Sequence, residues 1–293
     1  MEIRKALYRA RSLLEDIGIE SFGLDADILL AYILAIDRIT LYTRLYDRLS
    51  EEEEDRFFRF IARRMTGEPI AYLLSEKEFM GLSFKVTPDV LIPRPETEIL
   101  VEAGISLVSK MDRPIIIDVG TGSGAIAVSL AKYLKNEPQL FATDISLSAL
   151  KIAKLNADKL KAKVFFLCCD LLSGFSVKAD LIISNLPYVE RRNLLKYEPQ
   201  IALDGGLNGL SFYQRIFSEF HPLLSKNGVL ALEIGADQAE RISEIAKRQD
   251  FGPISLIKDL SEIERVLVTK KLGSSPNLVV KGNCQKLHCK LQI

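Results

Sequence analysis

The residues with the clearest chemical potential follow an apolar stretch, in the segment LIISNLPYVE. The side-chain oxygen of Asn185 and the backbone carbonyl of Leu186 can both accept hydrogens from one planar NH2 group. Tyr188 can stack on the π-plane of that group, and Pro187 restrains the turn. Two such acceptors would aim the lone pair of a weakly nucleophilic amide or aryl nitrogen at an electrophile and stabilise the charge that develops on it.

A second segment with chemical potential is DVGTGSGAIAVSLA, residues 118–131. Its glycines let a turn approach a ligand closely, and the helix expected after them offers free N–H groups and its positive end to an anion. We therefore assign the whole loop to cofactor binding. The residues assigned are Gly120, Thr121, Gly122, Ser123 and Gly124.

Two acidic residues follow later strands and extend this predicted site. Asp144, in FATDIS, is expected to accept hydrogen bonds from ribose hydroxyls, while Ser146 is the better candidate for the start of the next helix. Asp170, in CCDLL, is expected to face an adenine ring on which Leu171 packs.

Both NAD and S-adenosylmethionine (SAM) carry such a ribose, and Gly120, Gly122 and Ala125 also fit the dinucleotide pattern GxGxxA. Hydride transfer has no use for the acceptor pair at Asn185, whereas methyl transfer to an NH2 group does. We therefore expect SAM as the cofactor, with S-adenosylhomocysteine as the product.

The elements that must position these residues begin at Pro114, where apolar runs alternate with segments of helical period. Continuous apolar strands separated by helices predict a doubly wound, mostly parallel α/β sheet, whose ligands bind at the carboxyl ends of the strands. The predicted strands are Ile115–Val119, Leu140–Ala142, Val164–Leu167, Leu181–Ser184, Val229–Ile234 and Val266–Thr269.

The first 67 or so residues have helical periodicity throughout and form a predicted recognition module, because no cluster in them suggests chemistry. The last of its helices should start with a capping box of Ser50 and Glu53 and end at Gly67, before Pro69. A hairpin around Gly81 should follow, and then a helix beginning near Thr97.

These patterns predict four regions along the chain. They are a helical domain over 1–68, a hairpin connector over 69–92, a methyltransferase domain over 93–271, and a basic, flexible tail over 272–293.

Composition limits the possible partners. The chain has 39 basic and 39 acidic residues, and no stretch approaches the ~18 apolar residues of a membrane helix, so we expect a cytoplasmic protein. Nucleic acid is not expected as a partner, because a protein that neutralises phosphates usually carries a basic domain. The 4 cysteines are expected to be reduced, and no metal is expected, since Cys284, His288 and Cys289 are too few ligands.

Together these motifs resemble the release-factor glutamine methyltransferases, the HemK or PrmC family, over roughly residues 1–270. The resemblance rests on the segments EFMGLSFKV, LIPRPETEILVE, DVGTGSGAIA, NLPY and ALDGGLNGLSFYQRI, and on Asp144. It implies methyl transfer from SAM to the side-chain amide nitrogen of the glutamine in the GGQ motif of peptide chain release factors.

The resemblance also implies roles for individual residues. Gly120–Gly124, Asp144, Leu171 and Asn185 would line the SAM site, and Asn185, Leu186, Pro187 and Tyr188 would hold the glutamine. Arg94, Glu96 and Thr97 match the segment that covers this cleft in the family.

The sequence departs from the family pattern at two positions, because Leu186 replaces the first proline of NPPY and Leu171 replaces a frequent aromatic residue. NLPY is also similar to the motif of ribosomal RNA adenine dimethyltransferases, so a nucleic-acid amino-group methyltransferase is the rival hypothesis. Those enzymes generally place a helical domain after the catalytic sheet, whereas here it comes first. A SAM-binding scaffold without catalysis is the third alternative.

Overall fold

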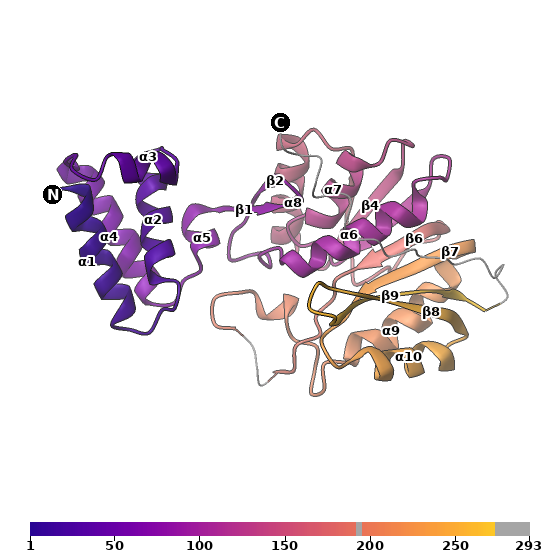
Figure 1. Ribbon diagram of the computed structural model, residues 1–293. Helices are drawn as coiled ribbons and strands as arrows, with labels where there is room; N and C mark the ends of the chain where they lie inside the picture. Colours follow the sequence, from indigo (N-terminus) through magenta and orange to yellow (C-terminus); the bar gives the residue numbers. More distant parts are fainter. Residues whose placement is uncertain (192–194, 273–293) are drawn as a thin grey trace. The chain divides into compact units, whose positions relative to one another are not determined.

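The computed structural model describes residues 1–191 and 195–272, which divide into two compact units (Figure 1). One unit contains residues 1–77 and 86–88, and the other contains residues 78–85 and the chain from residue 89 onward. Beyond residue 272, the predicted basic tail lies outside the described residues, as do Cys284, His288 and Cys289. No helix within the described ranges is long and apolar enough to cross a membrane.

The first unit is helical, as its periodicity predicts, and has a hydrophobic core of its own. Its helices are α1 (Ile3–Glu15), α2 (Phe22–Ile33), α3 (Arg38–Thr43), α4 (Glu51–Met65) and α5 (Ile70–Leu74). The predicted capping box is present at the start of α4, where Ser50 and Glu53 exchange hydrogen bonds of 3.2 and 2.8 Å. Gly67 follows α4 with a φ of +93°, which confirms the predicted end of this helix. The short α5, directly after Pro69, was not predicted.

The predicted hairpin is also present. Strands β1 (Glu76–Phe79) and β2 (Leu82–Lys85) form a separate two-stranded sheet. Phe79 and Phe84 are buried in the same core as helix α6 (Pro95–Val108), and the backbone N–H of Met80 donates to Glu98 of that helix. The hairpin therefore packs onto the element that carries Thr97.

A seven-stranded sheet forms the second unit, in the order β5-β4-β3-β6-β7-β9-β8 (Figure 1). Its strands are β3 (Ile115–Val119), β4 (Gln139–Asp144), β5 (Phe165–Cys168), β6 (Ala179–Ser184), β7 (Leu224–Glu233), β8 (Phe251–Lys258) and β9 (Glu264–Lys271). Strands β3 to β7 pair in parallel, and β9 pairs antiparallel with both β7 and β8. This confirms the predicted doubly wound, mostly parallel fold.

Strand β8 was missed by the sequence analysis. It contains Pro253, which cannot donate to a ladder and so argues against a strand, and it lies at the edge of the sheet, where proline is tolerated. Its burial alternates along the chain instead of forming a continuous apolar run. The six predicted strands all lie at or near the observed ones.

Helices cover both faces of the sheet, and successive strand residues pack on opposite sides. Ile116 belongs to the core with α6 and α7 (Ala125–Tyr133), to which α8 (Leu147–Lys159) also contributes. Ile117 belongs to the core with α9 (Ser211–Phe220) and α10 (Ala239–Arg248). Because both faces are covered, the central parallel strands β3, β6 and β7 are largely buried, whereas β5 at the edge of the sheet is largely exposed.

Helix α6 approaches the sheet closely through a glycine. A Cβ atom added to Gly104 would lie 3.0 Å from Ile183 Cδ1 and 3.3 Å from Leu130 Cδ2. The sheet and α7 thus leave no room for a side chain at this position, and this contact fixes the height of α6 above the strands.

We expect Gly104→Leu to lower the free energy of unfolding of this unit by about 1–3 kcal/mol, because it overpacks a filled core. Urea unfolding followed by circular dichroism measures this change. The matched control is Gly23→Leu in α2, where nothing lies within 4 Å of the added Cβ and the gain in helix propensity should leave stability equal or higher. Equal effects of the two substitutions would contradict the proposed close approach of α6.

Candidate active site

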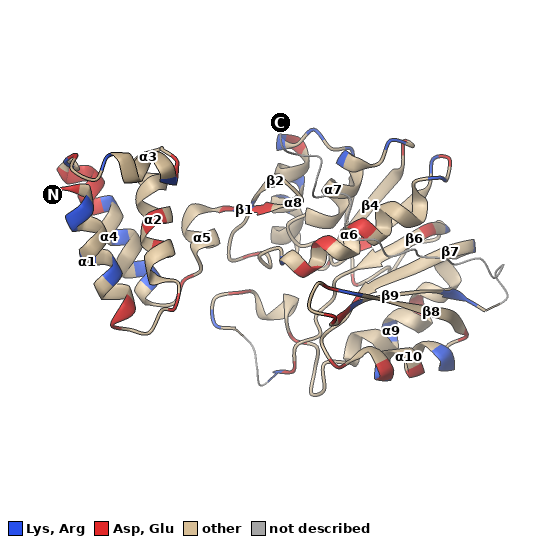
Figure 2. Cartoon of the chain, in the orientation of Figure 1, with Lys and Arg blue, Asp and Glu red and all other residues tan. Residues whose placement is uncertain are grey.

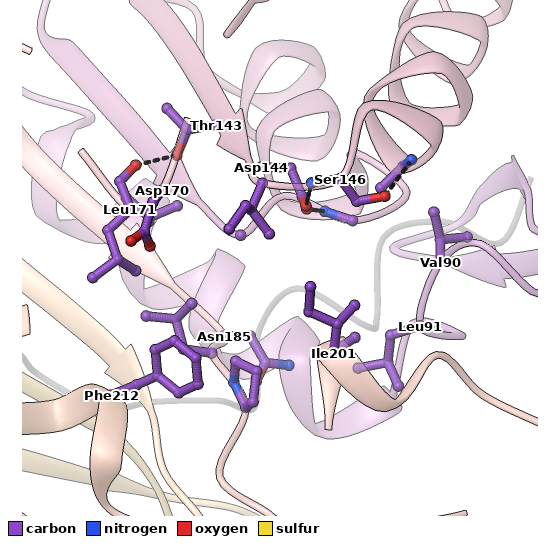
Figure 3. Close-up of a pocket in the computed structure, with 18 of the residues that line it drawn as sticks. Val90, Leu91, Thr143, Asp144, Ser146, Asp170, Leu171, Asn185, Ile201 and Phe212 are labelled. Carbon is purple, nitrogen blue, oxygen red and sulfur yellow. Dashed lines mark hydrogen bonds between the residues drawn. The ribbon is translucent and has the colours of Figure 1, made fainter. Parts of the chain in front are cut away.

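The main cavity of the second unit opens at the carboxyl ends of the central strands and has a volume of about 310 Å³. The chain runs from β3 outward to β4 and β5, then returns to place β6 on the other side of β3. This reversal is the topological switch point at which doubly wound sheets bind ligands. Residues that follow β3, β4, β5 and β6 surround the cavity, as Figure 3 shows.

The glycine loop between β3 and α7 forms one wall. Gly120 and Gly122 line the main cavity with φ of +71° and +54°, a region that favours glycine. A Cβ on Gly120 would lie 3.0 Å from Leu186 Cδ2, whereas a Cβ on Gly122 would have nothing within 4 Å. Thr121, Ser123 and Gly124 belong to the same loop but do not line the cavity.

Asp144 lines the main cavity at the end of β4 and braces the glycine loop. Its Oδ2 accepts from the backbone N–H of Gly122 at 2.9 Å, and its Oδ1 accepts from that of Ser146 at 2.9 Å. Burial raises the pKa of this carboxyl, against the lowering effect of these two bonds. Ser146 caps α8 as predicted, since its hydroxyl accepts from the N–H of Ala149.

Beneath the loop lies Asp118, a carboxyl to which the sequence analysis gave no role. It is fully buried at the end of β3, and its Oδ2 accepts from the Thr121 hydroxyl at 2.6 Å and from the N–H of Ala127 at 3.2 Å. Its Oδ1 has no partner among the described residues. Burial raises the pKa of Asp118 to about 7.

Asp170 and Leu171, both predicted from the sequence, also line the main cavity and lie beside Thr143 of β4 (Figure 3). Leu171 is buried, and its carbonyl accepts from the Thr143 hydroxyl at 3.0 Å. Asp170 is exposed and forms an ion pair of 2.9 Å with Arg215 of α9. Phe212 and Arg215 also line the cavity; both belong to the segment ALDGGLNGLSFYQRI, for which the sequence predicts no individual roles. Val90, Leu91 and Ile201 complete the apolar lining (Figure 3).

Asn185 follows β6 and lines both the main cavity and a second, side cavity of about 220 Å³. Its Nδ2 donates to the Thr97 hydroxyl at 3.0 Å. Its Oδ1 has no hydrogen-bond partner among the described residues. This oxygen is not fully buried, so it is accessible to a ligand. Leu186 and Pro187 line both cavities as well, while Tyr188 lines the side cavity.

Tyr188 is tied to Glu233, the last residue of β7. The Tyr188 hydroxyl donates to Glu233 Oε1 at 3.1 Å, and Tyr213 donates to the Glu233 backbone carbonyl at 3.0 Å. Burial raises the pKa of Glu233 to about 7, while the hydroxyls of Thr97 and Tyr188 lower it in part. Burial and the Glu233 charge raise the pKa of Tyr188, so that its phenol stays protonated.

Arg94, which the sequence analysis placed over the cleft, lines the side cavity immediately before α6. Its guanidinium forms an ion pair with the buried carboxylate of Glu198, which also accepts from the backbone N–H of Ile92 at 3.3 Å. The structure therefore places Arg94 and the NLPY segment around the side cavity, with Thr97 bound to Asn185 behind it.

Comparison with known proteins identifies the family. Residues 5–74 match the PrmC N-terminal domain, and residues 97–200 match the Methyltransferase small domain. A release factor glutamine methyltransferase of Clostridium acetobutylicum is 38% identical over 285 residues, which cover 93% of this chain and 100% of that protein. One of Moorella thermoacetica is 41% identical over 256 residues, covering 84% of this chain and 90% of that protein.

The chain belongs to the release factor glutamine methyltransferase family. This confirms the resemblance drawn from the motifs. In this member of the family, the NLPY segment lines both the main cavity and the side cavity.

Solved structures at lower identity share the fold of this release factor glutamine methyltransferase family member. The catalytic domain of hMettl16 aligns with a TM-score of 0.56 at 17% identity, over 75% of this chain and 84% of that chain. A methyltransferase from Pyrococcus furiosus aligns with a TM-score of 0.51 at 19% identity, over 71% of this chain and 95% of that chain. These likenesses support the methyltransferase sheet architecture alone.

We expect Asp118→Asn to change how stability depends on pH. Because folding raises the pKa of Asp118 from 3.8 to about 7, the stability that this group contributes is present below pH 4 and is lost as the pH rises through 7. The variant lacks this loss, so its free energy of unfolding relative to the original chain should rise by about 1.4 kcal/mol for each pH unit from pH 5 to about pH 7, and then level off.

Urea unfolding of both chains at several pH values measures this difference. Glu233 titrates in both chains and cancels from the comparison. A difference between the two chains that stays constant from pH 5 to pH 8 would contradict the raised pKa of Asp118.

Proposed function

We propose that this chain transfers a methyl group from SAM to the side-chain amide nitrogen of the glutamine in the GGQ motif of peptide chain release factors. The observation that carries the proposal is the placement of Asn185 between two cavities, with its Nδ2 bound by Thr97 and its Oδ1 accessible. An acceptor oxygen held in this way is what an incoming amide NH2 group requires.

The main cavity fits SAM by its chemistry. Its glycine wall admits close approach at Gly122, and each oxygen of Asp144 keeps a lone pair beyond the backbone hydrogen bond that it accepts. We assign Asp144 to the ribose hydroxyls, and Leu171 with Asp170 to the adenine end. In this arrangement Thr121, Ser123 and Gly124 shape the loop from behind.

When bound, SAM supplies an electrophilic methyl group on a positively charged sulfur. The substrate glutamine would enter the side cavity, where Asn185 Oδ1 and the Leu186 carbonyl accept its two amide hydrogens and Tyr188 packs on its plane. Asn185 and Leu186 would hold the amide nitrogen toward this methyl group, so that transfer would release S-adenosylhomocysteine and the amide would lose one proton to water. The two acceptors stabilise the positive charge on the nitrogen during this step.

The replacement of proline by Leu186 is compatible with this role. The acceptor at this position is a backbone carbonyl, which leucine also supplies. The Leu186 side chain is buried and reaches the glycine loop, where only the missing Cβ of Gly120 leaves it room. Leu186 thus links the substrate wall to the cofactor wall by packing, where proline would act through its restrained φ.

The helical unit is the proposed docking domain for the release factor, supported by its match to the PrmC N-terminal domain. Since release factors act in translation, we propose a cytoplasmic location. The rival substrate, an adenine amino group of nucleic acid, is less well supported by charge. Acidic and basic residues are interspersed over the helices that flank the sheet, and α6 beside the site carries Glu96, Glu98 and Glu102 (Figure 2).

Mass spectrometry of a release factor after incubation with this enzyme and SAM tests the function directly. We expect one added methyl group on the glutamine of the GGQ motif, and none on a release factor in which alanine replaces that glutamine. A parallel incubation with labelled SAM and RNA tests the rival substrate. Label found only in the RNA would overturn the proposal, and SAM binding without any product would favour a scaffold.

We expect Asn185→Ala to lower turnover of the release factor by ~100-fold or more, with little change in the Kd for SAM, by analogy with loss of one charge-stabilising hydrogen bond. Steady-state kinetics and calorimetry separate the two effects. The control is Asn136→Ala, which removes a half-buried amide bound to the carbonyls of Val108 and Met111 outside both cavities. Turnover at the original rate in Asn185→Ala would show that its role is assigned wrongly.

A further inference from the structure

Four side chains from three parts of the chain, the segment after β6, α6 and β7, lie in a line behind the proposed substrate site. Asn185, after β6, donates from Nδ2 to the hydroxyl of Thr97 on α6. The Thr97 hydroxyl also lies near enough to the carboxyl of Glu233, at the end of β7, to lower the pKa of that group, and Glu233 Oε2 is buried with no hydrogen-bond partner among the described residues. Glu233 accepts from the hydroxyl of Tyr188, three residues after Asn185. The line therefore begins and ends within the NLPY segment.

The orientation of an asparagine amide is not set by shape, because its oxygen and its NH2 group occupy nearly the same volume. If the amide of Asn185 turned over, it would present two hydrogens to a substrate amide that also needs to donate. The substrate amide would then lose one of its two hydrogen-bond acceptors and keep only the Leu186 carbonyl. A neighbouring group that accepts a hydrogen bond from Nδ2 therefore fixes the amide of Asn185 in the orientation that the reaction needs.

Thr97 is suited to this task only if its own hydrogen is held elsewhere. A hydroxyl can accept or donate, so an unrestrained Thr97 could donate to Oδ1 and stabilise the reversed amide. A carboxylate at Glu233 accepts but does not donate, so it takes the hydrogen of Thr97 and leaves the lone pairs of the hydroxyl for Nδ2. Both Thr97 and Glu233 are buried, at 4% and 1% exposure, so water does not compete well for these contacts.

We propose that Thr97 and Glu233 are positioning residues, which hold Asn185 with its oxygen toward the substrate amide and hold the Tyr188 ring against the same site. This inference rests on the proposed function and assigns a role to Thr97 within the segment PETE that covers the cleft. Neither residue touches the reacting atoms. Both act through Asn185 and Tyr188.

The protonation state of Glu233 is the variable in this arrangement. Burial raises its pKa to about 7, and Glu96 on α6 adds to the rise. Arg265 on β9 lowers it, although Arg265 is also paired with Asp259 at 2.9 Å. Tyr188 and Thr97 donate toward the carboxyl, and the phenol of Tyr213 on α9 is directed at the backbone carbonyl of Glu233.

A protonated Glu233 carries a hydrogen of its own and can donate it to the Thr97 hydroxyl. Thr97 is then free to donate to Oδ1 of Asn185, which favours the reversed amide. Turnover at saturating SAM should therefore rise as the pH increases through about 7, with the carboxylate as the active form.

The first test uses full-length Thr97→Val, which keeps the shape of the side chain but cannot accept from Nδ2. We expect kcat on the release factor to fall ~10- to 100-fold, the scale on which misplacement of a reacting group lowers rate, while the Kd for SAM changes less than about twofold. Thr97→Ser restores the hydroxyl and should recover most of the rate. The matched control is Thr269→Val, another buried threonine, whose hydroxyl donates to the carbonyl of Pro253 on β8.

The second test is the pH profile of Glu233→Gln, measured as kcat at saturating SAM. The side-chain amide of glutamine does not titrate and can both accept and donate, so it directs Thr97 less strictly. We expect a lower kcat at pH 8 and no rise in kcat near pH 7 in this variant. Asp118 titrates in both chains, so any dependence due to Asp118 remains in the variant.

Failure of the proposed function and failure of the inference about Thr97 and Glu233 would give different results. Lack of methylation of the release factor by the original chain would overturn the proposed function and this inference with it. An active original chain together with an active Thr97→Val, or with Glu233→Gln showing the original rise near pH 7, would overturn the inference alone. A loss in Thr97→Val that Thr97→Ser fails to recover, or that Thr269→Val reproduces, would also overturn it, since the effect would then be one of folding.

Discussion

The hydrogen bond from Asn185 Nδ2 to the Thr97 hydroxyl is the contact on which the proposed chemistry depends. It joins the end of β6 to the first turn of α6, two elements separated by 88 positions in the chain. For this bond to form, α6 must lie close to the sheet. Gly104 permits that approach, and the hairpin of β1 and β2 shares the core that α6 forms with the sheet and donates a hydrogen bond to Glu98 of the same helix.

The remainder of the site follows from the order of the strands. Because β4 and β6 lie on opposite sides of β3, the loops after them diverge and leave the main cavity between them. The glycine loop then has to turn tightly under Leu186, which the left-handed conformation of Gly120 allows. The wall assigned to the cofactor and the wall assigned to the substrate are thus packed against each other.

Two buried carboxyls support this edge of the sheet, and each has an oxygen without a partner among the described residues. Asp118 holds Thr121 and the start of α7, and Glu233 holds Tyr188. Burial of a carboxylate is costly unless it is paired, so neither residue is expected on grounds of stability alone. Both carboxyls lie near the carboxyl ends of their strands, β3 and β7, which is consistent with a role in supporting the site.

The sequence by itself determined the class of fold and the motifs. Periodicity located six of the seven strands of the large sheet because these strands contain runs of apolar residues, and turn chemistry located Ser50, Gly67 and Ser146 because caps are local interactions. The chemistry expected of Asn185 could be deduced from residue type and position after a strand. Residues that lie in one loop or in one strand exit were therefore the ones recognised.

Only the tertiary structure decided which residues meet across elements. Glu233 and Asp118 each end an apolar strand, as Asp144 does, but their burial and their partners depend on strands and helices distant in the sequence. Thr97, Phe212 and Arg215 lie in segments that carry the family resemblance. Those segments do not show that Thr97 binds Asn185, or that Phe212 and Arg215 reach the cavity. Edge strand β8 is not predicted by periodicity, because it contains Pro253 and its residues are alternately more and less buried. Its place in the sheet is set by pairing with β9. Such contacts come from packing, which periodicity and motif spacing do not encode.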